Sequence, residues 1–294
     1  MYEDIKKNKM KTGFIVFGFL LVITLIIYFI CNALDFGEFS IVVALIFSII
    51  STIITYYNCD KIVLASVDAR PATKEEDLKL TNILEALVVA SGLEHKPRLY
   101  VINSEQPNAF ATGRNPENAV ICVTTGLLEK LNYYELEGVI AHEMAHIRNY
   151  DILLSAVISV MVGFVVMLSD MTSRRRIRRN NDDNNNANAI LMLIGLVLLI
   201  ISPLVGKLLQ LAVSRRREYL ADATAVQFTR NPDGLISALK KISEDDNELD
   251  VASNGNAHMY IASPFRDKKM KEKTSIFDTH PPVSARIEAL ENLK

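Results

Sequence analysis

Long uncharged apolar stretches alternate with amphipathic segments along the chain. Four stretches contain no charged residue: Thr12 to Leu34, Phe39 to Cys59, Ile152 to Ser169 and Ile190 to Gly206. A helix rises about 1.5 Å per residue, so about 18 to 22 residues cover roughly 27 to 33 Å, which matches a hydrocarbon core of about 30 Å. The first two stretches therefore predict a transmembrane hairpin, with spans at about 12–34 and 39–59.

The first stretch shares one feature with a cleaved signal peptide, because lysines precede it at positions 6, 7, 9 and 11. A membrane span is favoured for three reasons. The apolar run is too long for the core of a signal peptide, no A-x-A-like cleavage site follows it, and the second stretch begins after only Asp35 and Glu38.

Basic residues indicate the orientation of this hairpin. Four lysines precede it, its turn at 35–38 has none, and Lys61 and Arg70 follow it. Because cytoplasmic flanks carry an excess of Lys and Arg, both ends are expected on the cytoplasmic side of a cytoplasmic membrane. The three cysteines are an odd number without a C-x-x-C pair, so they predict neither a disulfide framework nor a thiolate metal site and fit a reducing compartment.

The third and fourth stretches form a second hydrophobic hairpin at about 152–206, whose depth is ambiguous. Its loop carries five arginines between positions 174 and 179, followed by an Asn/Asp-rich tract that ends at Asn188. If both stretches cross the bilayer, these arginines lie outside, against the positive-inside tendency. Two crossings are marginally favoured because the last stretch is strongly apolar and the loop is short. A shallow hairpin with a cytoplasmic loop remains the alternative.

Helix signals occupy the segment between the two hairpins. Thr73-Lys-Glu-Glu76 has the spacing of a capping box, and the apolar positions that follow run to Gly92, a natural helix stop. A helix is therefore expected at 73–91. Asn132-Tyr-Tyr-Glu135 offers a second capping arrangement, which opens a helix that runs toward Asp151.

Strand signals lie between these two helices. Short strands are expected at 98–102 and 119–123, with a third at 108–112 and a turn at 113–116. The fold class is thus α+β and mainly helical, in an integral membrane protein.

Two parts are expected along the chain. Residues 1–59 form a cytoplasmic tail and the transmembrane hairpin, and residues 60–294 form a domain with a small β-sheet, interrupted by the second hairpin at about 152–206.

Composition agrees with this division. The 294 residues include 32 Lys+Arg and 34 Asp+Glu, for a net charge of −2, so the electrostatic case for a nucleic-acid-binding protein is absent. Half of the residues are hydrophobic, and the mean hydropathy is +0.19 beside an ordinary charged fraction of 22%. Apolar residues gathered into membrane segments explain that combination.

The second predicted helix contains His142-Glu143-Met144-Ala145-His146. Residues four apart lie on one helical face about 6 Å apart, so two imidazoles can bind one Zn²⁺ while Glu143 lies beside the open coordination position. Only five histidines occur in the chain, and two fall at this spacing. A chance occurrence on a surface helix is the alternative.

A catalytic zinc site needs a third protein ligand, and Glu218 is the best candidate. Leucines 204, 208 and 211 continue with Arg215, Glu218 and Asp222 in steps of three and four, so an apolar stripe leads into two carboxylates. A buried carboxylate needs a cation, which zinc would supply. Asp222 could accept the second ring N–H of a ligand histidine. The alternative is a pair of surface acids bound to Arg215 or Arg217.

The sequence resembles the HtpX membrane metalloproteases, which are relatives of the CAAX prenyl proteases. The resemblance covers nearly the whole chain and rests on more than the two zinc motifs. The matching segments are His142 to His146, Arg217 to Asp222, Asn108-Ala-Phe-Ala-Thr-Gly113, Ala257-His-Met-Tyr-Ile261, and His280-Pro-Pro282 with Arg286 six positions after the histidine. The Arg-rich and Asn-rich loop at 174–188 departs from the family pattern and leaves the depth of the second hairpin open.

The resemblance implies a gluzincin-like zinc domain and a role for each matching residue. His142, His146 and Glu218 would bind one Zn²⁺, and Glu143 would be the general base. Asn108, Ala109 and Phe110, continuing to Ala111, would form an edge strand that binds substrate, and Arg286 is grouped with these substrate-binding residues. His280 would lie near the metal.

Chemistry supports some of these roles without the family. Zinc makes water a nucleophile near neutral pH, Glu143 can accept and return a proton, and His280 could stabilise the oxyanion as a donor across the cleft. A helix-start residue is the alternative for His280, and an ordinary turn residue is the alternative for Asn108. His95 and His258 have no spaced partner and are interpreted as non-ligands.

The leading hypothesis is a zinc endopeptidase of the cytoplasmic membrane, with its zinc site facing the cytoplasm and misfolded or damaged membrane proteins as substrates. That substrate class is what the resemblance implies. An intramembrane protease is disfavoured because polar residues such as Asn132, Glu137 and Arg148 flank the motif. A non-catalytic membrane scaffold with a structural zinc is the alternative from another class. Two histidines and one carboxylate can also hold iron, although a helix-borne HExxH favours zinc. The sequence does not determine the oligomeric state.

Overall fold

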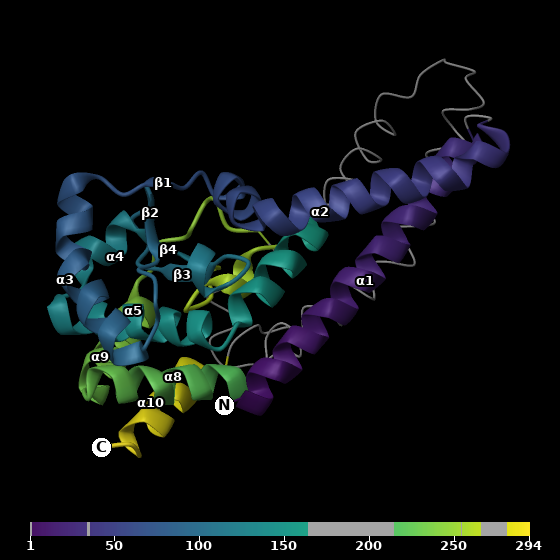
Figure 1. The fold of residues 1–294 in the computed structure, drawn as a ribbon. Coiled ribbons are helices and arrows are strands. Elements are labelled where there is room, and N and C mark those ends of the chain that lie inside the picture. The colour runs from purple at the N-terminus through teal and green to yellow at the C-terminus, as the bar shows by residue number, and fades with distance from the viewer. Residues whose placement is uncertain (1, 34–35, 164–214, 254, 266–280) are drawn as a thin grey trace.

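The computed structural model describes residues 2–33, 36–163, 215–253, 255–265 and 281–294. Two long N-terminal helices project from an α+β body (Figure 1). The part of the third apolar stretch beyond Gly163, the whole fourth stretch at 190–206 and the loop 174–188 lie outside the described residues, and so does His280.

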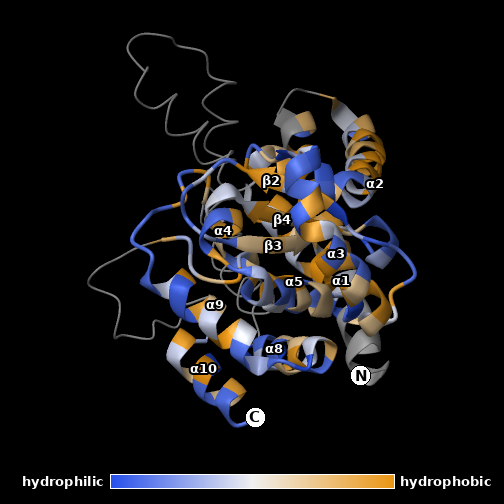
Figure 2. Cartoon of the chain, turned by 90° about the vertical axis from the view of Figure 1, so that its left-hand side faces the viewer, coloured by the Kyte–Doolittle hydropathy of each residue, from blue (hydrophilic) through white to orange (hydrophobic). Residues whose placement is uncertain are grey.

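The two projecting helices are α1 (Tyr2–Ala33) and α2 (Ser40–Ser66), which are joined through a short 3-10 helix, Gly37–Phe39. Each is long and apolar enough to cross a membrane, as predicted. Inside the hairpin, the Thr24 and Ser48 hydroxyls are hydrogen-bonded to each other at 2.7 Å. Such small polar pairs bind helices together where no water is present. Figure 2 shows α2 mostly in the hydrophobic colour.

Helix α2 continues past the predicted end of its span into the body of the protein. Its backbone leaves the helical region at Asn58 (φ −121°), and the helix then runs to Ser66. Cys59, Val63 and Leu64 in this last part are buried in one apolar cluster with Phe110 of the sheet. The membrane hairpin is therefore anchored directly in the core of the domain.

The sheet has four strands in the order β1-β2-β4-β3 and is mixed. The strands are β1 (Arg70–Pro71), β2 (Arg98–Ile102), β3 (Ala109–Thr112) and β4 (Val120–Thr124). The β2–β4 pair is parallel, and the other two pairs are antiparallel. The three longer strands confirm the prediction to within one residue at their ends. Two-residue β1 was not predicted.

Side chains alternate between the two faces of the sheet with the period of two that strands impose. Val101 and Ile121 belong to the main core, with helices α3 (Lys74–Ser91) and α5 (Tyr133–Arg148). Phe110 and Cys122 face the other way, toward the end of α2. Both faces are thus covered, and β3 lies at one edge.

Two capping boxes fix where α3 and α5 begin, as the sequence predicted. Thr73 and Glu76 exchange side-chain and backbone hydrogen bonds at the start of α3, and Asn132 and Glu135 do the same for α5. Helix α3 ends at Gly92, whose left-handed backbone (φ 69°) is the conformation that glycine adopts without strain.

Four further α-helices of the body are α4 (Thr125–Lys130), α8 (Arg215–Thr229), α9 (Pro232–Glu244) and α10 (Val283–Glu291). Short α4 was not predicted. Helices α5 and α9 approach so closely that a Cβ atom at Gly138 would lie 2.7 Å from the backbone nitrogen of Leu235. In Figure 1, α8, α9 and α10 cover the side of the body away from the sheet, with α5 between them and the strands.

The third apolar stretch begins as the helix Asp151–Gly163, which is bent by 86° from α5. Leu154 and Ile158 of this helix pack against Phe19 and Ile23 of α1 in a separate apolar cluster. The start of the second hydrophobic segment therefore contacts the first membrane hairpin.

The salt bridge at the start of α3 predicts a pH-dependent stability. Two hydrogen bonds from Arg70, at 2.8 and 2.7 Å, lower the pKa of Glu76 from 4.5 to about 2. Because the folded pKa lies below the unfolded one, the stabilisation is complete above about pH 5 and is lost as the pH falls toward 2. We expect Glu76→Gln to lower the melting temperature of the detergent-solubilised protein at pH 7, by an amount that shrinks steadily below pH 5.

Glu75→Gln is the matched control, because Glu75 lies exposed in the same helical turn. Its melting temperature should follow that of the wild type at every pH. If the difference in melting temperature between Glu76→Gln and the wild type stayed constant down to pH 2, the salt bridge would not be the source of a pH-dependent stability.

Candidate active site

Helix α5 brings His142, Glu143 and His146 to one buried face. His142 and Glu143 are each 1% exposed. The Nε2 atoms of His142 and His146 lie 3.2 Å apart, because the two residues are separated by one helical turn and their rings converge. Apolar residues of α5, Val139 and Ile140 among them, pack in the main core, and both rings lie against Glu218 of the neighbouring helix α8.

Glu218 at the start of α8 completes a three-residue group. Its Oε2 lies 3.7 Å from Nε2 of His142, and its Oε1 lies 3.6 Å from Nε2 of His146. Ligand atoms of the three residues all lie within 4.8 Å of one another. Two nitrogens on a tetrahedral zinc, at roughly 2.05 Å each, are about 3.3 Å apart, so both the donor types and their spacing fit a zinc ion.

Asp222, one turn beyond Glu218, contacts the far side of His142. Its Oδ1 lies 2.9 Å from Nδ1 of His142, so Nε2 is the ring nitrogen that faces His146 and Glu218. Arg286 of α10 donates to both oxygens of the same carboxylate, from Nε at 2.9 Å and from a terminal nitrogen at 2.7 Å. Its third hydrogen bond, at 2.8 Å, goes to the carbonyl of Ile261.

The surroundings shift the pKa values of these groups in different directions. Burial lowers the pKa of His142, despite its bond to Asp222. Burial acts in the same direction on His146, but the Asp151, Glu218 and Glu143 carboxylates outweigh it and raise that pKa to about 9.

The acids respond to the same environment. Burial and the nearby Glu218 carboxylate raise the pKa of Glu143 to about 7, against the opposing effect of His146 and Arg286. Burial would also raise the pKa of Asp222, but Arg286 and His142 lower it to about 2. Asp222 is thus held as an anion, and Glu143 is the acid that can exchange a proton near neutral pH.

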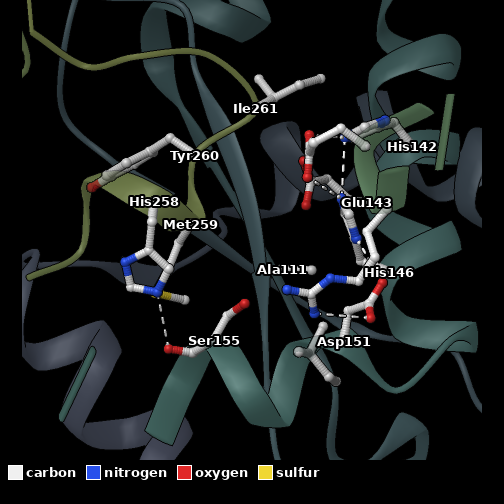
Figure 3. Close-up of a pocket in the computed structure, with 13 residues that line it drawn as sticks. Ala111, His142, Glu143, His146, Asp151, Ser155, His258, Met259, Tyr260 and Ile261 are labelled. Atoms are coloured by element: carbon white, nitrogen blue, oxygen red, sulfur yellow. Dashed lines mark hydrogen bonds and ion pairs between the residues drawn. The ribbon is translucent and has the colours of Figure 1, made fainter. Parts of the chain in front are cut away.

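A cleft opens onto these residues. Figure 3 shows His142, Glu143 and His146 on one side of it, with Ser155, His258 and Met259 opposite. Nε2 of His258 is hydrogen-bonded to the Ser155 carbonyl at 3.2 Å, across the cleft from the three-residue group. The whole lining comprises Ala111, His142, Glu143, His146, Asp151, Ile152, Ser155, Arg217, Glu218, His258, Met259, Tyr260 and Ile261.

Edge strand β3 contributes Ala111 to the cleft lining. Asn108 is 1% exposed, and its amide nitrogen donates to Gln106 at 3.3 Å and to the Ala262 carbonyl at 3.1 Å. Ala109 is buried in the main core, and Phe110 stacks edge-to-face on Tyr260 at 5.2 Å on the other face of the sheet. The structure thus places these side chains in the core and presents the strand's main chain to the cleft at Ala111.

The sequence assigned no site role to Asp151 or Ser155, yet both line the cleft. His258, interpreted from the sequence as a non-ligand, lines the cleft as well. Arg286, grouped in the sequence with the substrate-binding residues, is fully buried and lies against Asp222 instead of in the cleft lining. The contact between Arg286 and Asp222 joins residues 64 apart, which no local spacing reveals. His280 lies outside the described residues, so its predicted position near the metal stays a prediction.

An HExxH helix, a glutamate that converges with its two histidines, and two apolar N-terminal helices are together the features of a metallohydrolase attached to a membrane. The chain belongs to peptidase family M48, whose model matches residues 74–294. It is a membrane-bound zinc metalloprotease, a metalloendopeptidase, and neither a non-catalytic scaffold nor an intramembrane protease is favoured. The resemblance noted in the sequence is thus confirmed.

Relatives match over the full length. A protease HtpX homolog of Caldanaerobacter subterraneus subsp. tengcongensis is 43% identical over 100% of this chain and 98% of its own length. One from Listeria monocytogenes serotype 4a is 40% identical, with both chains covered completely. The crystal structure of S. mikatae Ste24p is similar in fold, with a TM-score of 0.51 and 18% identity. That match covers 97% of this chain and 65% of Ste24p.

The buried Arg286–Asp222 pair predicts a large loss of stability when the arginine is removed. Arg286→Ala would leave the Asp222 carboxylate buried without a cation, which costs about 3–5 kcal/mol in comparable pairs. The measurement is the midpoint of denaturant unfolding in detergent. Arg98→Ala is the comparison, because Arg98 is 48% exposed in its pair with Asp60 and water can replace it. Equal losses of unfolding free energy for the two variants would contradict the inference that Arg286 compensates a buried Asp222 carboxylate.

Proposed function

We propose that His142, His146 and Glu218 hold a single zinc ion and that Glu143 is the general base of peptide-bond hydrolysis. The observation that carries this proposal is the convergence of the three ligand atoms to within 4.8 Å in the wall of an open cleft, with Glu143 beside them. The arrangement corresponds to a gluzincin site, in which an HExxH helix supplies two ligands and a later helix supplies a glutamate.

The chain's own residues have separate tasks in this chemistry. Zinc, when bound, acts as a Lewis acid that activates water near neutral pH and polarises the scissile carbonyl. Glu143 accepts the proton of the attacking water and returns it to the leaving amine. Asp222 accepts from Nδ1 of His142 and fixes the tautomer whose Nε2 faces the cation. His280 is proposed as the donor that stabilises the oxyanion. The residue after it in the sequence, Pro281, lies just before α10, which carries Arg286.

Substrate binding is proposed to use the main chain of β3. The Thr124 backbone N–H donates to the Asn108 carbonyl, whereas the Ala109 carbonyl accepts from the Ile261 backbone N–H, on the side away from β4. Alternate residues of an antiparallel strand face the same side, so the backbone groups of Ala111 also point away from β4. An extended substrate segment pairing there would be bound with little dependence on its sequence.

Membrane proteins are the proposed substrates, with misfolded or damaged ones as the physiological class. Supporting this, the helix Asp151–Gly163 packs against α1 and also supplies Ile152 and Ser155 to the cleft. The cleft therefore lies next to the membrane-associated helices, where segments of other membrane proteins are at high local concentration.

The proposed topology has two parts, 1–59 and 60–294, with the second hydrophobic hairpin at about 152–206 interrupting the second part. The kink at Asn58 supports a boundary there, although α2 continues into the domain. The proposed location is the cytoplasmic membrane with the zinc site on the cytoplasmic side, supported by the basic flanks of the hairpin, Lys61 and Arg70 included. Because the end of α2 packs on the sheet, the domain lies on the side where α2 ends.

Paired substitutions separate the roles of the two glutamates. Glu143→Gln should keep stoichiometric zinc but lower casein turnover by at least about 100-fold, because only proton transfer is removed. Glu218→Gln should lower both bound zinc and turnover, because a ligand is lost. Turnover is measured with zinc-loaded, detergent-solubilised protein, and zinc by elemental analysis after gel filtration.

Glu137→Gln is the matched control on α5, because Glu137 lies outside the cleft lining. It should bind zinc and cleave casein as the wild type does. Wild-type turnover by Glu143→Gln would remove the general-base assignment, and unchanged zinc in Glu218→Gln would show that another residue is the third ligand.

Labelling of the hairpin turn tests the orientation. Glu38 is exposed between α1 and α2, and all three native cysteines are buried. We expect Glu38→Cys in intact cells to react with a membrane-impermeant maleimide added from outside. A cysteine at Glu75, exposed on α3, should react only after the cells are opened. The reverse pattern would place the zinc site outside the cytoplasm.

A further inference from the structure

Both ligand histidines have a carboxylate on the ring nitrogen that faces away from the cation position, and an arginine beside that carboxylate. For His142 the pair is Asp222 and Arg286, described above. For His146, Oδ2 of Asp151 lies 3.2 Å from Nδ1, and the other oxygen of Asp151 lies 3.3 Å from Arg217. The spacing of Asp222 from Glu218 in the sequence suggested that Asp222 contacts a ligand histidine. No sequence pattern suggested the same for Asp151.

Asp151 reaches His146 only because the chain turns sharply between them. Side chains five residues apart on a continuous helix point about 140° away from each other. Here α5 ends at Arg148, Tyr150 adopts a left-handed backbone (φ 59°), and the next helix leaves at 86°. A non-glycine residue in this conformation is strained, and such strain persists where the surrounding structure requires the geometry. The turn directs the Asp151 carboxylate back onto the ring.

The same carboxylate connects two elements that carry zinc ligands. Asp151 is 7% exposed in its side chain and contacts His146 of α5 with one oxygen. Its other oxygen contacts Arg217, which directly precedes the third ligand, Glu218, on α8. Movement of Asp151 would therefore disturb the ring of one ligand and the start of the helix that bears another.

We propose that Asp151 is a positioning residue that holds the His146 ring, and with it the start of α8, in the geometry that binds zinc. This inference rests on the proposed function, because it assigns a role relative to the proposed ligands. Asp151 accepts the Nδ1–H of His146, which leaves Nε2 as the nitrogen that faces the cation. It also makes zinc binding depend on the helix Asp151–Gly163, the element that packs against α1.

A purely structural role for Asp151 would give different results. An acidic residue at the first position of a helix stabilises that helix through its dipole, whether or not metal is present. Such a role would change thermal stability but not the affinity for zinc of the folded protein. Zinc affinity and the spectrum of a substituted metal are therefore the informative readouts.

The experiment compares full-length wild type, Asp151→Asn and Asp60→Asn in detergent. Asp60 is the matched control, because it is also a buried aspartate paired with an arginine, Arg98 at 2.6 Å, but it lies far along the chain from the zinc motifs. Each protein is loaded with zinc, and the zinc dissociation constant is measured by competition with a chromophoric chelator. Cobalt(II) is then substituted, and its visible absorption is recorded. Thermal unfolding of the same samples checks folding.

We expect Asp151→Asn to weaken zinc binding by about 10- to 100-fold and to alter the cobalt spectrum, as loss of a partner of a metal-bound histidine typically does. Asp60→Asn should bind zinc within twofold of the wild type, whatever its melting temperature. Wild-type zinc affinity and an unchanged cobalt spectrum in Asp151→Asn would overturn the proposal.

If Asp151→Asn does not fold, Arg217→Gln is compared instead, because it keeps the carboxylate and removes its contact with Arg217. Weaker zinc binding than in Asp60→Asn supports the proposal, and equal binding overturns it. Failure of the proposed function is visible separately: a wild-type protein that binds no stoichiometric zinc would remove the ligand assignment and this inference together, before any variant is compared.

Discussion

Buried charge where α5, α8 and α10 meet is the constraint on which the rest of the structure depends. Glu143, Glu218 and Asp222 are at most 7% exposed, and carboxylates removed from water cost several kcal/mol each unless cations compensate them. Arg286 compensates Asp222 directly, and the two histidines with Glu218 leave a position for a divalent cation. Separating these helices would leave these charged groups without their partners, so the packing of this region depends on them.

The sheet and the membrane helices are arranged around that centre. One face of the sheet packs on α5, which fixes the ligand helix, and the other face packs on the end of α2. The helix Asp151–Gly163 contributes to the cleft at Ser155 and packs against α1 at Leu154. The cleft thus lies between two packing contacts with the membrane hairpin.

Local chemistry made much of this arrangement predictable. The capping boxes at Thr73 and Asn132, the strands and the HExxH spacing are decided within a few residues, where backbone hydrogen bonding and helical period dominate. Two other features depend on contacts that local patterns do not encode. Asp151 reaches its partner only through a strained turn, and Arg286 meets an aspartate 64 residues away. Two-residue β1 is too short to show the period of a strand.

The shape of the cleft limits what can be cleaved. The Ile261 backbone N–H occupies the Ala109 carbonyl at the edge of β3, so the edge that is left for the proposed substrate pairing begins at Ala111. Ser155 and Met259 form the opposite wall of the cleft, across from the proposed zinc position. A segment must therefore be extended and must have its own backbone hydrogen-bonding groups free before it can bind. Folded proteins rarely expose such segments, and damaged or unassembled ones do, so we infer that the cleft selects substrates by their loss of structure more than by their sequence.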